Sequence, residues 1–165
     1  MPANDLCNRL ISEYGDSIFR MCFLYLKDYH LAEDATQETF IKAVTAYSSF
    51  HGQSAEKTWI TRIAINCCKN ITRTKWFKTT RVNPQDYILE KEDTDLLEDL
   101  LLKDSISKAI MELKQEDREV IVMYYYQELS VKEIATVLKK SENTILQKLN
   151  RARKRLKEQL KEVSE

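Results

Sequence analysis

Three segments before residue 80 repeat their apolar residues at the spacing of an amphipathic helix. The first covers about residues 6–26, and the second, about residues 31–50, sets its apolar residues opposite a polar stripe. The third carries residues 59–81 and follows the turn sequence "HGQS", in which Gly52 breaks the helical pattern. Because apolar positions three and four residues apart fall on one side of a helix, the pattern predicts three helices that share a core.

The same spacing resumes in the C-terminal part of the chain and predicts four shorter helices, at about residues 104–113, 116–126, 131–138 and 142–163. The stretch between the two helical parts contains Pro84 and a run of acidic residues without a steady period. The chain of 165 residues has only two glycines and two prolines, which are too few for the turns of a sheet protein.

We therefore expect an all-α fold of two small helical domains. A three-helix domain covers residues 1–78, a flexible acidic linker covers residues 79–103, and a four-helix domain covers residues 104–165. Trp59 adjoins the apolar side of the third helix, so we expect it to pack in the core rather than to face a ligand.

The last two predicted helices and the step between them have the arrangement of a helix-turn-helix: "SVKEIATVL", then "KKS", then "ENTILQKLNRARKRL". Ser130 and Ser141 stand where each helix needs an N-cap. The turn position that glycine often holds is Lys139 here. This lysine must either adopt a positive φ, at a cost of about 1 kcal/mol, or lie in a turn that avoids it.

The second helix of this motif has an apolar and a polar side. The apolar side is predicted to pack inward and consists of Ile145, Leu149, Ala152 and Leu156. On the polar side, amides near the helix start suit base edges, while arginine and lysine further along suit phosphates. The candidate DNA-contacting residues of this side are Asn143, Gln147, Asn150, Arg151 and Lys154.

Charge is segregated along a chain whose totals balance, at 26 Lys and Arg against 26 Asp and Glu. Residues 59–81 hold six basic residues and no acidic one, whereas residues 82–107 carry a net charge of −6. Like charges at helical spacing repel each other, and a polyanion such as nucleic acid would offset that repulsion. The residues that share the polar side of the third helix are Arg62, Asn66, Lys69 and Arg73.

Other functional classes find little support in the sequence. No stretch resembles a signal peptide or a membrane span, so we expect a cytoplasmic protein without membrane insertion of its own. The four cysteines form no CxxC pair, and we expect neither a metal site nor a cofactor. The two histidines are isolated, and no Gly-rich phosphate loop or nucleophile–base spacing is present, which argues against an enzyme with catalytic residues.

Three motifs resemble those of bacterial sigma factors of the extracytoplasmic-function (ECF) group, within the sigma-70 family. "AEDATQETFIKA" (32–43) is similar to region 2.2, and "KTWITRIAINCCKNITR" (57–73) is similar to regions 2.3 and 2.4. "REVIVMYYYQELSVKEIATVLKKSENTILQKLNRARKRL" (118–156) is similar to region 4. The motifs cover most of the chain, and their order and separation, with an acidic linker between them, make the resemblance specific.

This resemblance implies a factor that binds core RNA polymerase, directs it to promoters and helps to open the −10 region. Its implied partners are core polymerase, through the β′ coiled coil and the β subunit, promoter DNA, and an anti-sigma factor of a kind that can be membrane-bound. The second helix would dock on the β′ coiled coil, which places three residues at that interface: Asp34, Gln37 and Glu38.

The resemblance also divides the DNA contacts between the two domains. The third helix with the preceding loop, 47–55, would bind −10 DNA and hold a flipped base. Asn66 stands at the base-reading position, while Arg62, Lys69 and Arg73 would hold the strand backbone. The C-terminal helix would enter the major groove of the −35 element.

An alternative from the class of binding modules is a stand-alone helix-turn-helix regulator. It leaves the acid-free third helix unexplained and would normally add a dimerisation surface to match a palindromic site. A gel shift without polymerase separates the two hypotheses, because a regulator binds a short duplex alone whereas a sigma factor needs core enzyme.

Overall fold

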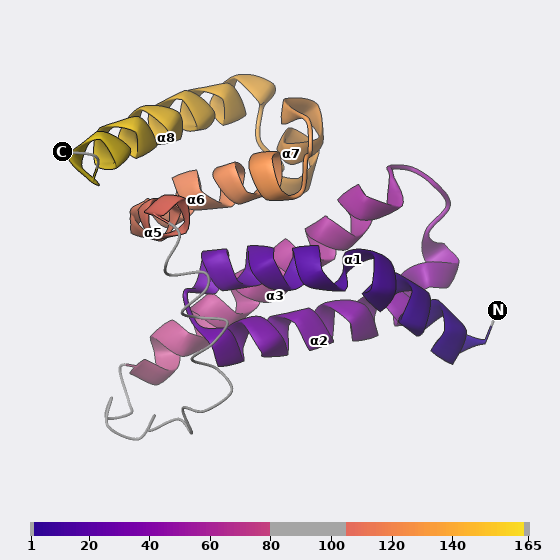
Figure 1. Ribbon diagram of the computed structural model, residues 1–165. Coiled ribbons are helices and arrows are strands. Elements are labelled where there is room, and N and C mark those ends of the chain that lie inside the picture. The colour runs from indigo at the N-terminus through magenta and orange to yellow at the C-terminus, as the bar shows by residue number, and fades with distance from the viewer. Residues whose placement is uncertain (1, 80–104, 164–165) are drawn as a thin grey trace.

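The computed structural model of the protein describes residues 2–79 and 105–163, and among these residues it contains helices and no strand (Figure 1). This confirms the predicted all-α class. The predicted linker lies outside the described residues except for Thr79. In chain order the elements are α1 (Ala3–Leu26), α2 (Tyr29–Ala46), the 3-10 turn η1 (Tyr47–Ser49), α3 (Glu56–Thr79), α5 (Ser105–Glu112), α6 (Gln115–Ile121), the π-helical turn η3 (Val122–Tyr126), α7 (Val131–Leu138) and α8 (Glu142–Val163).

A tight turn reverses the chain between α1 and α2. Lys27 adopts a left-handed conformation with a φ of 59°, and its N–H donates to the carbonyl of Phe23 at 2.7 Å. Asp28 then caps α2 by accepting a hydrogen bond from the N–H of Leu31 at 2.9 Å. Because this cap lies outside the apolar stripe, α2 begins at Tyr29 rather than at residue 31, where the hydrophobic pattern starts.

The three N-terminal helices pack side by side around one apolar core (Figure 1). On α3 the apolar residues that recur at helical spacing are Ile60, Ile63, Ala64, Cys67 and Ile71. Ile60, Ala64 and Cys67 are fully buried, while Ile63 and Ile71 are partly buried at the margin. Further buried side chains come from α1 and α2, among them Leu10, Ile18, Cys22, Phe23, Ala35 and Phe40. The apolar periodicity therefore predicted correctly which side of α3 faces its neighbours.

The predicted helix-turn-helix is formed by α7 and α8. The Ser130 hydroxyl accepts from the N–H of Glu133 at 3.1 Å, and the Ser141 hydroxyl accepts from the N–H of Thr144 at 3.1 Å, so both predicted caps are confirmed. Lys139 in the turn has a φ of 56°, which means that the lysine itself adopts the left-handed conformation. Ile145, Leu149 and Ala152 are fully buried and Leu156 is partly buried, as their spacing predicts.

The helix predicted for residues 116–126 is not one continuous α-helix. α6 ends at Ile121, and the chain continues through η3, where the N–H of Gln127 donates to the carbonyl of Val122 at 3.2 Å. A π-helical turn is wider than an α-helical one and changes the direction of the side chains that follow it. Gln127, directly after this turn, is fully buried.

The two helical bundles pack directly against each other, which the hydrophobic pattern did not predict. Figure 1 shows α6 running beside α1 and α7 lying beside the N-terminal half of α3. Gln127 donates to the carbonyl of Ser17 in α1 at 2.9 Å and accepts from the hydroxyl of Thr61 in α3 at 3.3 Å. Arg118 donates to the carbonyl of Tyr25 at 2.8 Å. The buried side chains of Gln127 and Arg118 thus each make a hydrogen bond across the contact, which compensates part of the cost of their burial.

Candidate nucleic-acid interface

The basic face of α3, defined as Arg62, Asn66, Lys69 and Arg73, is partly exposed and partly covered. Asn66 and Arg73 are exposed, whereas Arg62 and Lys69 are half-buried. The guanidinium of Arg73 donates to the side-chain oxygen of Asn70. The Nε of Arg62 is buried and has no hydrogen-bond partner among the described residues. The four side chains lie along one helix, as predicted, but only Asn66 and Arg73 are freely accessible.

A cleft separates this face from the C-terminal bundle. Its volume is about 790 Å³, and Lys69 and Arg73 line it from α3 while Glu116 and Glu119 line it from α6. The Nζ of Lys69 lies 4.0 Å from a carboxylate oxygen of Glu119. The remaining lining residues are Tyr25, Asn66, Asn70, Thr72 and Gln115. The cleft therefore sets cations from α3 against carboxylates from α6.

Burial and neighbouring charges act in opposite directions on Glu119. Burial raises the pKa of the Glu119 carboxyl, while the Lys69 ammonium lowers it. The Tyr25 hydroxyl donates to Glu119 at 3.5 Å and accepts from the Gln115 side chain at 2.6 Å. The carboxyl is thus held between α1, α3 and its own helix, at the junction of the two bundles.

Aromatic rings surround the base of the loop between η1 and α3. The rings of Phe50 and Trp59 stack with centroids 4.8 Å apart, and the ring of Tyr47 meets that of Trp59 edge-on at 5.8 Å. Trp59 packs against the core, as predicted, although it is only partly buried. Gly52 has a φ of 76°, a conformation that glycine adopts without strain. The loop thus begins on a fixed aromatic base and is exposed beyond it.

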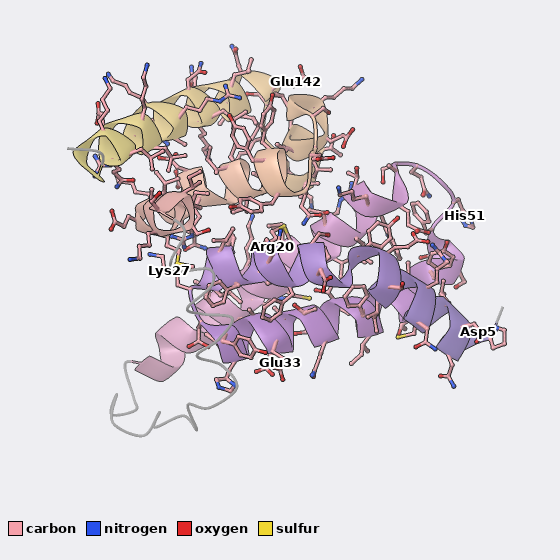
Figure 2. The ribbon with its side chains drawn as sticks, viewed as in Figure 1. Asp5, Arg20, Lys27, Glu33, His51 and Glu142 are labelled. Atoms are coloured by element: carbon pink, nitrogen blue, oxygen red, sulfur yellow. The ribbon has the colours of Figure 1, made fainter. Side chains whose placement is uncertain are left out.

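The predicted core-binding residues share the outer side of α2. Asp34 and Gln37 are exposed, and Glu38 is half-buried, with its carboxylate 2.9 Å from the Lys42 ammonium. Figure 2 shows Glu33 on the side of α2 that faces away from the C-terminal helices. The opposite side of α2 packs into the core with Ala32, Ala35, Thr39 and Ala43. The polar stripe is therefore open to a partner, and Figure 1 shows α1 lying between α2 and the C-terminal helices.

The polar side of α8 is open along its length. All five candidate residues, Asn143, Gln147, Asn150, Arg151 and Lys154, are exposed. Leu146 is exposed beside them, at 42%. An exposed leucine among polar side chains is suited to an apolar contact such as the methyl group of thymine.

Arg151 has a partner within the protein. Its Nη2 lies 2.6 Å from one carboxylate oxygen of Asp117 in α6, and its Nε donates to both oxygens at 3.2 and 3.1 Å. Asp117 is buried, and its contact with Arg151 raises the pKa of the arginine. A charge-assisted fork of this kind fixes the direction of the guanidinium. The sequence gives no sign of this pair, because the two residues belong to different helices.

Sequence reasoning missed two further polar residues near these surfaces. Gln127 joins the two bundles, and Glu56 begins α3 and binds Arg9 of α1 at 2.9 Å. Neither residue belongs to a periodic polar stripe, so helical spacing could not single them out. Only their partners, which are distant in sequence, reveal their role.

The described residues contain neither a metal-binding cluster nor a membrane-spanning helix. In residues 2–79 and 105–163, no cluster of three or more His, Cys, Asp or Glu side chains is arranged to hold a metal ion. Within the same part of the chain, no helix has both the length and the apolarity needed to cross a membrane.

Comparison with known proteins gives the same two regions. The family described as "Sigma-70 region 2" matches residues 10–78, and "Sigma-70, region 4" matches residues 103–156. The ECF RNA polymerase sigma factor SigW of Bacillus subtilis is 31% identical, over 93% of this chain and 88% of that protein. The RNA polymerase sigma-H factor of Pseudomonas aeruginosa is 30% identical, over 87% of this chain and 80% of its own length.

Two solved structures share the fold. The sigma factor RpoE of Bartonella quintana, solved with the anti-sigma factor NepR, matches with a TM-score of 0.73 and 23% identity, over 95% of this chain and 97% of that chain. CnrH, solved with the cytosolic domain of CnrY, matches with a TM-score of 0.69 and 20% identity, over 96% and 89%. The two family regions match in the order that the motifs predict, and the relatives align along most of the chain. This protein therefore belongs to the ECF group of the sigma-70 family of RNA polymerase sigma factors.

Proposed function

We propose that this protein binds core RNA polymerase in the cytoplasm, directs it to specific promoters and helps to open the −10 region. Membership of the ECF sigma factors supports this activity. The assignment of the DNA-binding surfaces rests mainly on the basic face of α3, which contains no acidic residue. Asn66, the proposed base-reading residue, is exposed in the middle of this face. A stand-alone helix-turn-helix regulator has no use for this face.

In this proposal the −10 element meets α3 and the loop 47–55. Asn66 reads a base, because its amide both donates and accepts hydrogen bonds. Arg73 is exposed and can approach the strand backbone directly, whereas Lys69 reaches it only after leaving Glu119. Single-stranded DNA also takes up stacking contacts with aromatic rings, and the partly buried rings of Tyr47, Phe50 and Trp59 lie at the base of this loop.

The −35 element meets α8 in the major groove. Asn143, Gln147 and Asn150 are exposed and suited to base edges, and Lys154 is suited to a phosphate. Arg151 is oriented by Asp117, so we assign it a fixed direction of approach rather than a free one. A guanidinium held in this way can still present its remaining N–H groups to guanine or to a phosphate.

Core polymerase meets the outer side of α2 through Asp34, Gln37 and Glu38. The exposure of the first two residues and the distance of this side from the C-terminal bundle support the assignment. Residues 1–78 then form the unit that binds core polymerase and the −10 element, residues 79–103 the linker, and residues 104–165 the unit that binds the −35 element.

Full access to the basic face requires the two bundles to move apart, since Lys69 and Arg62 are half-buried in the packed arrangement. Binding partners can favour either the packed or the separated arrangement, according to which of the two they bind more tightly. RpoE of B. quintana was solved with an anti-sigma factor, and we propose that a protein of this class also binds this chain.

Transcription in vitro tests the proposed function. Core polymerase with this protein should initiate on a subset of a promoter library, and core polymerase alone should not. A gel shift without polymerase tests the alternative regulator. Tight binding of this protein alone to a short duplex, without any stimulation of core polymerase, would contradict the proposal.

A further inference from the structure

Glu56, the first residue of α3, lies at the centre of a hydrogen-bonded network. Its two carboxylate oxygens accept from the Arg9 guanidinium at 2.9 and 3.0 Å. The hydroxyls of Tyr14 and Tyr47 donate to the same carboxylate at 3.0 and 2.6 Å. Arg9 also donates to the Tyr47 hydroxyl at 3.0 Å. One carboxylate thus satisfies four donated hydrogen bonds in a fixed geometry.

The network keeps one protonation state at neutral pH. The Arg9 hydrogen bonds, with help from both tyrosine hydroxyls, lower the pKa of Glu56 to about 2. Partial burial and the hydrogen bond to Glu56 raise the pKa of Tyr14 to about 12. Glu56 therefore always accepts and the tyrosines always donate, so the arrangement of donors and acceptors does not change near pH 7.

These four residues join three segments of the chain. Arg9 and Tyr14 belong to α1, Tyr47 begins η1 after the end of α2, and Glu56 begins α3. Tyr47 and Glu56 stand on either side of the exposed loop 50–55. The carboxylate of Glu56, on one side of the loop, is therefore hydrogen-bonded to Tyr47 on the other side. Arg9 of α1 binds both residues.

The loop itself has few contacts that could fix its position. His51, Gly52, Gln53 and Ala55 are exposed, and a Cβ added at Gly52 would meet nothing within 4 Å. Figure 2 shows His51 at the tip of the N-terminal bundle, away from the C-terminal helices. At its ends the loop is held by Phe50, which stacks on Trp59, by the carbonyl of Ala55, which accepts from the N–H of Trp59 at 3.0 Å, and by the network at its two sides.

We propose that Glu56, Arg9 and Tyr47 form a positioning unit that holds loop 50–55 in the conformation that receives a −10 base. This inference rests on the proposed contact of the loop and α3 with −10 DNA. The stability of the fold does not by itself explain such a network. Apolar side chains of similar volume often stabilise a fold as well as a partly buried ion pair does. Directional hydrogen bonds to one carboxylate fix the position of both loop ends, which apolar packing does less specifically.

The test measures base discrimination in holoenzyme reconstituted from core polymerase and variants of this protein. Glu56→Gln keeps the shape of the side chain and removes its charge, and Tyr47→Phe removes one hydroxyl. On promoters with single base changes in the −10 element, both variants should lose discrimination at one position by about three- to tenfold. Because both residues act through one network, the double variant should lose no more than Glu56→Gln alone.

Glu13→Gln is the matched control, because Glu13 contacts Arg9 at 3.3 Å but is bonded to neither Tyr47 nor Glu56 in this network. It should keep wild-type discrimination. Glu56→Gln with a lowered melting temperature but unchanged discrimination would overturn the inference, as would a uniform loss on all promoters. If wild-type holoenzyme itself showed no base preference in the −10 element, the proposed −10 contact would fail as well. Failure of the positioning unit alone is thus distinguishable from failure of the proposed function.

Discussion

The ammonium of Lys69 lies 4.0 Å from a carboxylate oxygen of Glu119, and the two residues belong to different bundles. Lys69 is part of the basic face of α3, while the side chain of Glu119 in α6 is only 10% exposed. A carboxylate at this position offers Lys69 the same charge that a DNA phosphate would offer. In the packed arrangement, the C-terminal bundle and DNA therefore compete for one lysine.

Replacing Glu119 by glutamine should increase binding of single-stranded DNA by the intact chain. The change removes the competing charge, and because Lys69 is partly exposed we expect a gain of up to about fivefold at low salt. Fluorescence anisotropy with a labelled oligonucleotide measures the affinity. Glu33→Gln makes the same change in net charge on the far side of α2 (Figure 2) and should have little effect. Equal gains in both variants would attribute the effect to net charge and not to the contact.

Two side chains of α8 should affect −35 recognition differently. Gln147→Ala should relax the preference at one base pair, at a loss of about 1–3 kcal/mol for a bidentate contact. Lys154→Ala should weaken binding to all promoters alike. It should also reduce the slope of log affinity against log salt concentration by about 1. Transcription on a set of −35 variants at two salt concentrations separates the two effects. Identical profiles for both variants would contradict the division into a base reader and a phosphate contact.

Signals from residues close together in the sequence predicted much of this fold. Contacts between residues far apart in the sequence could not be predicted. The capping serines Ser130 and Ser141 and the bounds of α7 and α8 follow from residues only a few positions apart. The contact between Gln127 and Ser17, by contrast, joins residues 110 positions apart and leaves no periodic pattern. The structural role of a buried glutamine can be inferred only when its hydrogen-bond partner is known.

The candidate site shows the same division. Helical spacing placed Arg62, Asn66, Lys69 and Arg73 on one side of α3, but it could not indicate which of them another bundle covers. It likewise placed Arg151 on the open side of α8, yet the buried Asp117 that orients it lies 34 positions earlier. Spacing gives the direction of a side chain around its own helix, whereas exposure depends on how the helices pack.

Reversing the charge of both Asp34 and Glu38 on α2 should weaken binding to core polymerase. The expected loss is on the order of tenfold or more, since close charge pairs at interfaces couple by about 1.5–7 kcal/mol. Pull-down of core enzyme measures it, and circular dichroism should show unchanged helicity because Asp34 is exposed and the Glu38 side chain is 43% exposed. Reversing Glu142 in the first turn of α8 is the control. Undiminished binding of the α2 variant would move the core interface elsewhere.

Asn66 and Lys69 on the basic face of α3 should affect promoter melting in different ways. Asn66→Ala should reduce open-complex formation mostly on the preferred −10 sequence and leave core binding intact, because in the proposed contact the amide reads a base and carries no charge. Permanganate footprinting of unpaired thymines measures the melting. An equal reduction on preferred and altered −10 sequences would show that Asn66 does not read a base.

Lys69→Glu should depress melting on every promoter, and more severely at low salt, where charges are least screened. This substitution also puts a second carboxylate beside Glu119, so it disturbs the packing of the bundles as well as any contact with DNA. The double variant Lys69→Glu with Glu119→Gln separates the two causes, because it removes the repulsion within the protein and keeps the repulsion from phosphate. If the double variant remains defective at low salt, Lys69 contacts the strand backbone. If it melts promoters as the Glu119→Gln variant does, the lysine serves the contact between the bundles, and DNA must bind the basic face of α3 through Arg62 and Arg73 instead.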